Sequence, residues 1–395
     1  MEKSMPDDDR VRRANLIKKI EQSRGSRLLV YVTGDRQGVP VQIAEDAVRP
    51  MYVHLLSFAQ DNSGMPDKID LLLYSRGGAV EVPWRIVSMV REFCKQFAVL
   101  VPYKAHSAAT MVALGADVIV LGPKGELGPI DPSTNLLREV QAPQGVVQVP
   151  DSVNVEDLMA FVDFLKSRVG LTDQAGLSSL LEVLIHSLHP WVVGGMYRTH
   201  AHIDLVARKL LDRRNTKISE AQANAIIKTL VEETYLHGHA IGRREAKDLG
   251  LPIAEPDSEL EQLLWEVYLE YERMLRLGEP IDVNTFVPKG QDEHAEPDCV
   301  LAVIESREML HDYKANLVGR AVRQLPANLN LTINVNVQPP VGGPQPAQQQ
   351  VQQLQQILNQ LQQEIAQQVN QQLRSQAPIV RREFRIEDGR WDRAI

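Results

Sequence analysis

The chain has 395 residues and a formal net charge of −8, with 44% hydrophobic and 24% charged residues. This composition is typical of a soluble globular protein, and no run approaches the roughly 20 apolar residues that a membrane-spanning helix requires. The negative net charge argues against a general nucleic-acid surface. We therefore expect no membrane and no nucleic acid among the partners of the protein.

The N-terminal residues 1–24 are charged and helical in pattern, and they lack the apolar segment and cleavage site of a signal peptide. Only two cysteines occur, Cys94 and Cys299, which are too few for a disulfide framework or a closed zinc site. We therefore expect an N-terminal helix in a cytoplasmic protein.

Short apolar runs rich in branched residues alternate with helical patterns through the first 125 residues. Repeated strand–helix units of this length are typical of an α/β fold with a parallel sheet and right-handed crossovers. In chain order, we expect strand 27–32, helix 44–60, strand 69–75, a helix of about 17 residues after Gly78, strand 98–102, a helix from Ser107 and strand 118–122.

Residues 155–236 have an almost wholly helical pattern, which predicts a helical extension of the sheet domain. We expect helix breaks at Gly170, Pro190 and the pair Gly194–Gly195. Thr172 and Ser219 are the expected helix N-caps. The preceding stretch, 134–150, is rich in glycine, proline and glutamine, which predicts a mobile loop. One further helix is expected over 258–277.

The C-terminal part carries weaker patterns. Alternation over 329–337 predicts an exposed or edge strand, and a linker rich in proline and glutamine follows it. A heptad seam then spans about two to three heptads. Its apolar positions are Val351, Leu354, Leu358, Leu361 and Ile365. We expect this helix to join copies of the chain, with packing on its own chain or disorder as the alternative.

Two motifs each follow an apolar strand and open a helix, YSRGGAV at 74–80 and YKAHSAAT at 103–110. Amides at a helix N-terminus stabilise developing negative charge, and the pair Gly77–Gly78 lets a substrate backbone approach closely. On adjacent parallel strands, the two turns would meet at one sheet edge. Taken alone, however, a glycine pair is more often a simple turn, and Ser107 is more often a helix N-cap.

Four segments, by their order and spacing, resemble the serine dehydrogenase proteinase family, which is related to signal peptide peptidase A and the Clp protease subunit. They are LLLYSRGGAV (71–80), VPYKAHSAATMVALGADVIVLGP (101–123), ELGPIDPS (126–133) and, more weakly, YLHGHAIGRREAKDLGLP (235–252). The resemblance implies the Clp/crotonase superfold, a parallel β-sheet with repeated strand–helix units, here with a helical extension and a C-terminal appendage.

The resemblance covers about residues 25–255. Outside this range, the organisation is predicted from composition and local sequence patterns. The expected organisation is an N-terminal helix (1–24), a Clp/crotonase-like serine peptidase domain (25–255), a helix and strand appendage (256–338), a linker rich in proline and glutamine with a short coiled-coil helix (339–378), and a C-terminal tail (379–395).

The resemblance also implies the chemistry of the site. Ser107 corresponds to the nucleophile, and the amides of Gly77 or Gly78 and of Ala108 correspond to the oxyanion hole. The implied reaction is amide hydrolysis through an acyl-enzyme, with no cofactor. Arg76 departs from the family, in which a proline commonly precedes the glycine pair, and it adds a cation beside the cleft.

The general base is the least defined part of the site. Clp subunits use a histidine in the turn that here is ELGPID, which holds only Asp131, whereas signal peptide peptidases use a lysine several dozen residues beyond the serine. Lys166 fits that position, and burial among its apolar sequence neighbours would favour the neutral amine. Two alternatives stay open: a solvent-facing Lys166, or Lys104 or Lys124 as the base.

Other titratable residues fit a catalytic role less well. His106 adjoins Ser107, but consecutive residues entering a helix point about 100 degrees apart, so we keep it, with Asp131, only as a candidate site-lining residue. The pairs His200/His202 and His237/His239 lack i, i+4 spacing and accompanying cysteines. We therefore expect no metal.

Three hypotheses follow. The first is a serine peptidase that acts on protein or peptide substrates within a homo-oligomer, since the resembling superfold usually assembles. The second is a non-catalytic oligomeric scaffold whose glutamine-rich C-terminal helix recruits a protein partner. The third is a crotonase-type acyl-CoA enzyme, against which the serine at 107 and the absence of a carboxylate over 105–110 argue.

Overall fold

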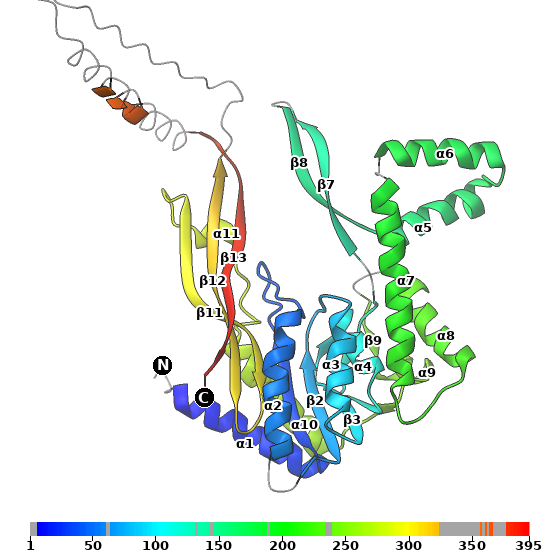
Figure 1. Cartoon of the computed structure of the whole chain (residues 1–395), viewed down its shortest axis with the longest axis vertical. Helices are drawn as coiled ribbons and strands as arrows, with labels where there is room; N and C mark the ends of the chain where they lie inside the picture. Colours follow the sequence, from blue (N-terminus) through cyan, green and yellow to red (C-terminus); the bar gives the residue numbers. More distant parts are fainter. Residues whose placement is uncertain are drawn as a thin grey trace, which may run out of the picture. The chain divides into compact units, whose positions relative to one another are not determined.

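The computed structural model of the chain divides into two compact units (Figure 1). Its described residues are 6–60, 64–130, 133–142, 145–187, 190–233, 239–323, 356–357, 360–361, 363–365 and 377–394. Unit 1 comprises Met1–Pro280, Cys299–Ala315 and Asp388–Ile395, and unit 2 comprises Ile281–Asp298 and Asn316–Glu387. The segments with the serine and glycine motifs therefore lie in unit 1.

A parallel sheet forms the centre of unit 1. Its strands are β1 (Arg27–Thr33), β2 (Lys68–Tyr74), β3 (Gln96–Val101), β5 (Val118–Leu121) and β10 (Ile253–Ala254). Their order is β10-β5-β3-β2-β1, and β11 (Glu293–Glu305) pairs antiparallel with β1. Strands β1 and β2 are buried at almost every position, as expected when both faces of a parallel sheet are covered. The predicted parallel sheet is confirmed.

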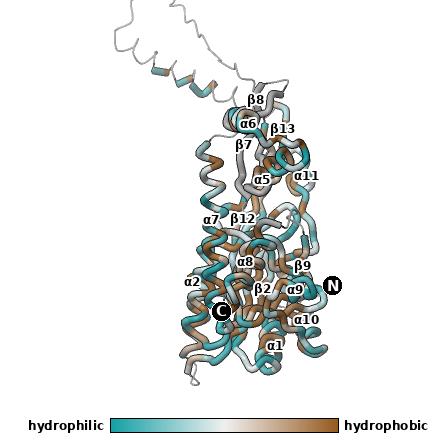
Figure 2. Tube along the Cα trace, turned by 90° about the vertical axis from the view of Figure 1, so that its right-hand side faces the viewer, coloured by the Kyte–Doolittle hydropathy of each residue, from teal (hydrophilic) through white to brown (hydrophobic). Residues whose placement is uncertain are grey.

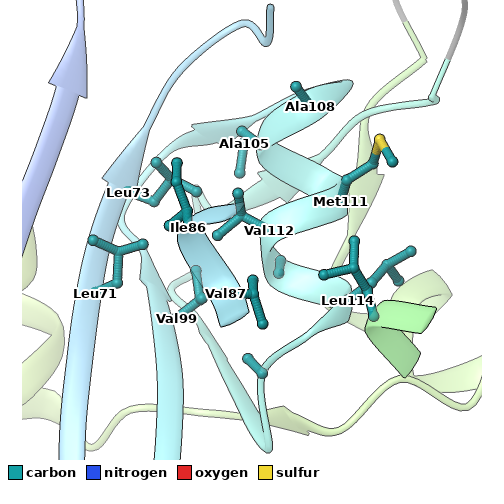
Figure 3. Close-up of a cluster of buried hydrophobic side chains, with 14 of the residues drawn as sticks. Leu71, Leu73, Ile86, Val87, Val99, Ala105, Ala108, Met111, Val112 and Leu114 are labelled. Atoms are coloured by element: carbon teal, nitrogen blue, oxygen red, sulfur yellow. The ribbon is translucent and has the colours of Figure 1, made fainter. Parts of the chain in front are cut away.

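Helices α2 (Val48–Gln60), α3 (Val82–Arg91) and α4 (Ala108–Leu114) cover one face of this sheet. Figure 3 shows Val112 of α4 packed near Ile86 of α3 and the strand residues Leu71 and Leu73. Helix α3 is shorter than the predicted helix of about 17 residues, because it begins only at Val82, with a proline in its first turn, and already ends at Arg91. This packing fixes the N-terminus of α4, where the motif serine lies.

The other face is covered by α1 (Pro6–Arg24) and α10 (Ser258–Met274), both of which the sequence predicts. Alternate residues of β2 separate the two faces, since Leu72 packs with this second cluster whereas Leu71 packs with the first. In Figure 2 the tube around β2 is brown, whereas the short surface helix α9 (Arg243–Asp248) is largely teal. The N-terminal helix is therefore an integral layer of the core.

Glu305 is a buried ionic hub that joins the N-terminal helix to the sheet. Its carboxylate accepts hydrogen bonds from Arg13 Nε and Tyr271 Oη, both at 2.8 Å. Arg10 Nε forms an ion pair with the other carboxylate oxygen at 3.0 Å. Glu305 is fully buried, so each of these partners offsets part of the cost of removing its charge from water. The hub ties α1 and α10 to the end of β11.

The helical extension consists of α5 (Val155–Phe164), the π-helical turn η2 (Leu165–Val169), α6 (Gln174–Ser187), α7 (Pro190–Asp212), α8 (Glu220–Lys228) and a second π turn, η3 (Thr229–Glu233). Ser219 caps α8, as predicted. Two local predictions are wrong. Helix α7 continues through Gly194–Gly195, and Asp173 rather than Thr172 accepts a bond from the first turn of α6, at 2.7 Å to the amide of Gly176.

Several short elements complete unit 1. The stretch predicted to be a mobile loop contains a hairpin, β7 (Ser133–Ala142) and β8 (Gly145–Asn154), whose residues pair in a regular antiparallel register. The alternation of branched residues there outweighs the glycine and proline content. A small sheet contains β4 (Lys104–Ala105), β6 (Glu126–Leu127) and β9 (Ile241–Gly242), and the turn η1 (Glu45–Ala47) precedes α2.

Unit 2 contains strand segments that the sequence does not predict. It includes the short helix α11 (Val283–Phe286) and parts of β11, of β12 (Leu310–Arg323) and of β13 (Ile379–Arg393). Phe286 packs edge-on against His294 and Phe384 in this unit. The predicted strand 329–337 and most of the predicted heptad seam lie outside the described residues. No helix among the described residues is long and apolar enough to cross a membrane.

A buried histidine pair predicts acid sensitivity. His54 of α2 bonds to Ser306 Oγ and to His311 Nδ1, both at 2.9 Å. Burial, reinforced by His311, Arg393 and Arg10, lowers the pKa of His54 to about 3. The unfolded chain binds this proton below about pH 6.5, so the stability that His54 contributes is present above that pH and is lost as pH falls toward 3, by at most about 1.4 kcal/mol per unit.

We expect His54→Gln to lower the free energy of unfolding at pH 7.5. The fall in this free energy from pH 7.5 to pH 5 should be smaller in the variant than in wild type, as measured by urea unfolding at both pH values. His311 still titrates in this variant, so the pH dependence shrinks without vanishing. Gln60→Ala is the control on the same helix, because Gln60 is exposed and carries no titratable group, and it should keep the wild-type pH dependence. Equal pH dependence in wild type and His54→Gln would contradict the prediction.

Candidate active site

Ser107 lies at a strained turn between β4 and α4. Its φ of 51° and ψ of −116° lie in a region that side-chain-bearing residues seldom adopt. It occupies the N-cap position of α4, yet its side chain makes no capping hydrogen bond, and it is only 8% exposed. A capping serine would adopt extended backbone and accept an amide bond, so the helix-cap alternative for Ser107 does not fit this geometry.

The glycine turn after β2 lies directly against Ser107. A Cβ atom added to Gly77 would lie 2.7 Å from the Cβ of Ser107 and 3.2 Å from the amide nitrogen of Ala108. Gly77 also has a φ of +112°, which favours glycine. The two motifs that the sequence places on neighbouring strands therefore meet in space, and only a glycine fits at their contact.

The backbone amides around Ser107 differ in their availability. The Gly77 amide donates to Ser75 Oγ at 3.0 Å, within the turn. Ile43 holds the turn from its other side, since its amide donates to the Gly77 carbonyl and its carbonyl accepts from the Ala79 amide. In the described part of the chain, the amides of Gly78 and Ala108 have no such acceptor. Of the predicted oxyanion-hole donors, these two are therefore the better placed.

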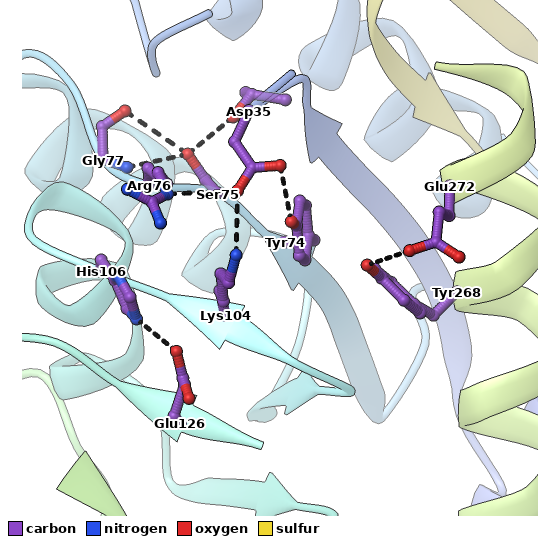
Figure 4. A network of polar contacts seen from close by, with 11 residues as sticks. Asp35, Tyr74, Ser75, Arg76, Gly77, Lys104, His106, Glu126, Tyr268 and Glu272 are labelled. Carbon is purple, nitrogen blue, oxygen red and sulfur yellow. Dashed lines mark hydrogen bonds and ion pairs between the residues drawn. The ribbon is translucent and has the colours of Figure 1, made fainter. Parts of the chain in front are cut away.

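A cluster of charged residues borders the glycine turn (Figure 4). Asp35 accepts bonds from Tyr74 Oη at 2.7 Å and from Lys104 Nζ and Arg76 Nε, each at 3.1 Å. Burial raises the pKa of Asp35, but the Tyr74 bond and the two cations outweigh burial and hold the pKa below its usual value. Lys104, a candidate base in the sequence, is thus already bound to a carboxylate.

His106 points away from the glycine turn in Figure 4 and bonds to Glu126, with 3.0 Å between Nε2 and Oε1. Burial lowers the pKa of His106, and the attraction of Glu126 only partly opposes this shift. The ring also packs closely on Gly128, since a Cβ there would lie 2.7 Å from its Cγ. His106 therefore supports the turn that follows β6.

The turn over 128–130 also contacts the segment that carries Ser107. The Ser107 amide donates to the Pro129 carbonyl at 3.2 Å, and the Ile130 amide donates to the Leu230 carbonyl at 2.8 Å. Asp131, which the sequence keeps as a candidate site-lining residue, lies outside the described residues. Lys124, the other candidate base, has its Nζ 4.8 Å from the centre of the Tyr103 ring.

Lys166 differs from its predicted environment. It lies in the π turn η2 and is exposed, and so are its apolar neighbours Phe161, Phe164 and Val169, at 43%, 54% and 59%. The expectation that these side chains bury the amine is therefore wrong for the single chain. No hydrogen bond joins Lys166 to Ser107 among the residues that the structure describes.

A cavity of about 610 Å³ opens beside the glycine turn. It lies between the residues that follow the turn and helix α7. Its lining residues are Val80, Glu81, Val192, Gly195, Met196, Arg198, Thr199 and His202. The lining is largely apolar and also includes the polar side chains of Glu81, Arg198 and His202, so the cavity is suited to a side chain or chain segment of a larger substrate.

The sequence patterns missed four residues that shape the site. They are Thr33, Asp35, Ile43 and Glu126, each of which contacts a motif residue from a distant segment. Of these four residues, only Glu126 belongs to a motif identified in the sequence, since it is the first residue of ELGPID. Within the described ranges, no three His, Cys, Asp or Glu side chains are grouped so as to hold a metal ion.

Comparison with known proteins supports the class that this fold and site indicate. Residues 5–158 match the family model described as "ClpP-like SDH-type serine proteinase". The match over these residues confirms the resemblance predicted from the motifs, and the parallel sheet with its strand–helix units is the α/β arrangement that the resemblance implies. The matched residues include Gly77, Gly78, Ser107 and Ala108.

Two curated relatives are uncharacterized proteins of Methanocaldococcus jannaschii. MJ0137 is 24% identical over 200 residues, which are 51% of this chain and 58% of that protein. MJ1495 is 22% identical over 250 residues, which are 62% of this chain and 72% of that protein. The chain thus spans less than two thirds of the first relative.

Similar solved structures include a serine-to-alanine mutant of the 1510-N membrane-bound stomatin-specific protease, with 15% identity, a TM-score of 0.31, and coverage of 60% of this chain and 85% of that one. ClpP1 from Listeria monocytogenes has 15% identity, a TM-score of 0.32, and coverage of 62% and 99%. A probable enoyl-CoA hydratase/isomerase from Mycobacterium abscessus has 15% identity, a TM-score of 0.25, and coverage of 59% and 66%.

The contact between the two turns predicts a specific sensitivity. We expect Gly77→Ala to lower the free energy of unfolding by about 1–3 kcal/mol, because the new Cβ meets Ser107 and the φ is unfavourable. Urea unfolding measures this change. Gly122→Ala is the control, since nothing lies within 4 Å of its Cβ position, and we expect about 0.5 kcal/mol or less. Equal stability of the two variants would contradict the described contact.

Proposed function

We propose that the protein is a serine peptidase that hydrolyses peptide bonds of protein or peptide substrates through an acyl-enzyme on Ser107. The observation that carries the proposal is the strained, uncapped Ser107 packed against Gly77, with the amides of Gly78 and Ala108 beside it. An activated serine next to paired backbone donors is the arrangement that acyl transfer needs. The family match over residues 5–158 supports the same class.

In the proposed reaction, Ser107 Oγ attacks the substrate carbonyl carbon while a base accepts the hydroxyl proton. The carbonyl oxygen gains negative charge, which the Gly78 and Ala108 amides stabilise. The carbon–nitrogen bond then breaks, and the leaving amine takes the proton from the protonated base. Water attacks the resulting ester in a second cycle of the same steps and releases the acid.

We keep Lys166 as the proposed base and link its role to assembly. Its amine must be unprotonated to accept a proton, and desolvation is the usual way to favour that form. Phe161, Phe164 and Val169 expose apolar surface around it, which a neighbouring copy or a bound substrate would cover. In this proposal the peptidase works as a homo-oligomer, and the dyad is complete only when this surface is buried.

The other expectations about partners and location also remain proposals. We propose a cytoplasmic enzyme without a cofactor, with the glutamine-rich C-terminal helix as a contact for copies of the chain or for a protein partner.

The scaffold alternative predicts an unreactive Ser107, so one reactivity experiment separates it from the peptidase. The crotonase alternative predicts turnover of an acyl-CoA and no covalent serine adduct.

We expect a fluorophosphonate probe to label the wild-type protein at Ser107, with all labelling lost in Ser107→Ala. Mass spectrometry of the intact protein and of its peptides measures the adduct and its position. Ser167→Ala is the control, because Ser167 is exposed and its hydroxyl donates to the Asp163 carbonyl of the same helix, and its labelling should equal that of wild type. A wild type that stays unlabelled, or an adduct that persists in Ser107→Ala, would overturn the proposed function.

We expect Lys166→Ala to slow this labelling by about 10²-fold or more, which is a typical contribution of a general base. The labelling rate constant is the measurement, and light scattering checks that the assembly keeps its size. Arg168→Ala removes an exposed cation from the same π turn and should leave the rate unchanged. Labelling of Lys166→Ala at the wild-type rate would eliminate Lys166 as the base.

A further inference from the structure

Ser75 is a buried polar residue that connects both turns of the candidate site. It follows the last residue of β2 and precedes the glycine turn by one residue, and it has no exposed surface. Neither the serine motif nor the oxyanion assignment gives it a role. A fully buried hydroxyl is costly unless its hydrogen bonds are satisfied, so its contacts indicate what it contributes.

The backbone of Ser75 holds the segment that carries the nucleophile. Its amide donates to the Lys104 carbonyl, and its carbonyl accepts from the His106 amide, both at 3.0 Å. These two bonds form an isolated parallel bridge between Ser75 and Ala105, directly before Ser107. These bonds tie the backbone that leads into Ser107 to the end of β2, directly before the glycine turn.

The side chain of Ser75 holds the glycine turn itself. Its Oγ accepts the Gly77 amide at 3.0 Å, receives a bond from Thr33 Oγ1 at 2.7 Å and donates to the Gly77 carbonyl at 3.4 Å (Figure 4). Thr33, the last residue of β1, is also fully buried. The three groups form a chain of hydrogen bonds from β1 through Ser75 to the turn, and in a buried setting such a chain restricts the turn to one conformation.

We infer that Ser75, oriented by Thr33, is a positioning residue that selects the oxyanion-hole donor. By occupying the Gly77 amide within the turn, it leaves the Gly78 amide as the donor that faces the same substrate oxygen as Ala108. This inference rests on the proposed function, because it concerns the reaction at Ser107. Ser75 does not touch the substrate, and its effect passes through the backbone of Gly77 and Gly78.

Three variants test the inference with two reagents. Ser75→Ala removes the hydroxyl that accepts the Gly77 amide and donates to the Gly77 carbonyl. Thr33→Val removes only the hydroxyl that orients Ser75, and Thr33→Ser keeps that hydroxyl as the matched control. A fluorophosphonate reports reaction through a charged, oxyanion-like state. Iodoacetamide acting on Ser107→Cys in each background reports access and reactivity at position 107 without an oxyanion hole.

We expect Ser75→Ala to slow phosphonate labelling by about tenfold to 10²-fold, somewhat less than the loss of a whole oxyanion donor, and Thr33→Val to slow it in the same direction. Thr33→Ser should stay within about twofold of wild type, since its hydroxyl is retained. Alkylation of Ser107→Cys should proceed at the same rate in every background, because it needs no oxyanion donor.

Two results would overturn the inference. One is a phosphonate rate that Ser75→Ala and Thr33→Val leave unchanged. The other is an equal loss of phosphonate labelling and cysteine alkylation, which would show a general structural role for Ser75. Failure of the proposed function looks different, because then the wild-type protein itself forms no adduct at Ser107.

Discussion

The close approach of two backbone turns, Gly77 against Ser107, is the constraint on which the rest of the site depends. A Cβ at Gly77 would lie 2.7 Å from that of Ser107, so the turns can meet only where one residue has no side chain. Parallel order brings both turns to the same sheet edge, and the packing of α3 and α4 on β2 and β3 holds them there. The strain at Ser107 persists because this surrounding core is well packed.

Buried hydrogen bonds then decide which backbone groups remain available for chemistry. Ser75 takes the Gly77 amide, and Ile43 takes the carbonyl of Gly77, so the turn has a single arrangement. The nearby charges are also largely paired, since Asp35 binds Lys104 and Arg76 beside the turn. What remains is the largely buried Ser107 hydroxyl, and in the proposed function the amides of Gly78 and Ala108 stabilise negative charge beside it.

The sequence predicted the parallel strands and the paired turns well, because strand periodicity and glycine–serine motifs are local signals. It could not predict Thr33, Ile43 or Asp35, whose roles depend on contacts between distant segments. The burial of Lys166 was inferred from apolar neighbours in sequence, but those neighbours lie exposed on η2 and α5. The strands β11 and β12 were missed although residues 300–304 of β11, VLAVI, form an apolar run of the kind that marks a buried strand.

The most direct test of the convergent turns is a crystal structure of the protein with a phosphonate bound covalently to Ser107. We expect the phosphoryl oxygen to lie within about 2.7–3.1 Å of the amide nitrogens of both Gly78 and Ala108. The Gly77 amide should still donate to Ser75 in this adduct. An oxygen that points to solvent, or that binds the Gly77 amide after Ser75 has released it, would contradict the convergence of the two turns on one oxyanion site.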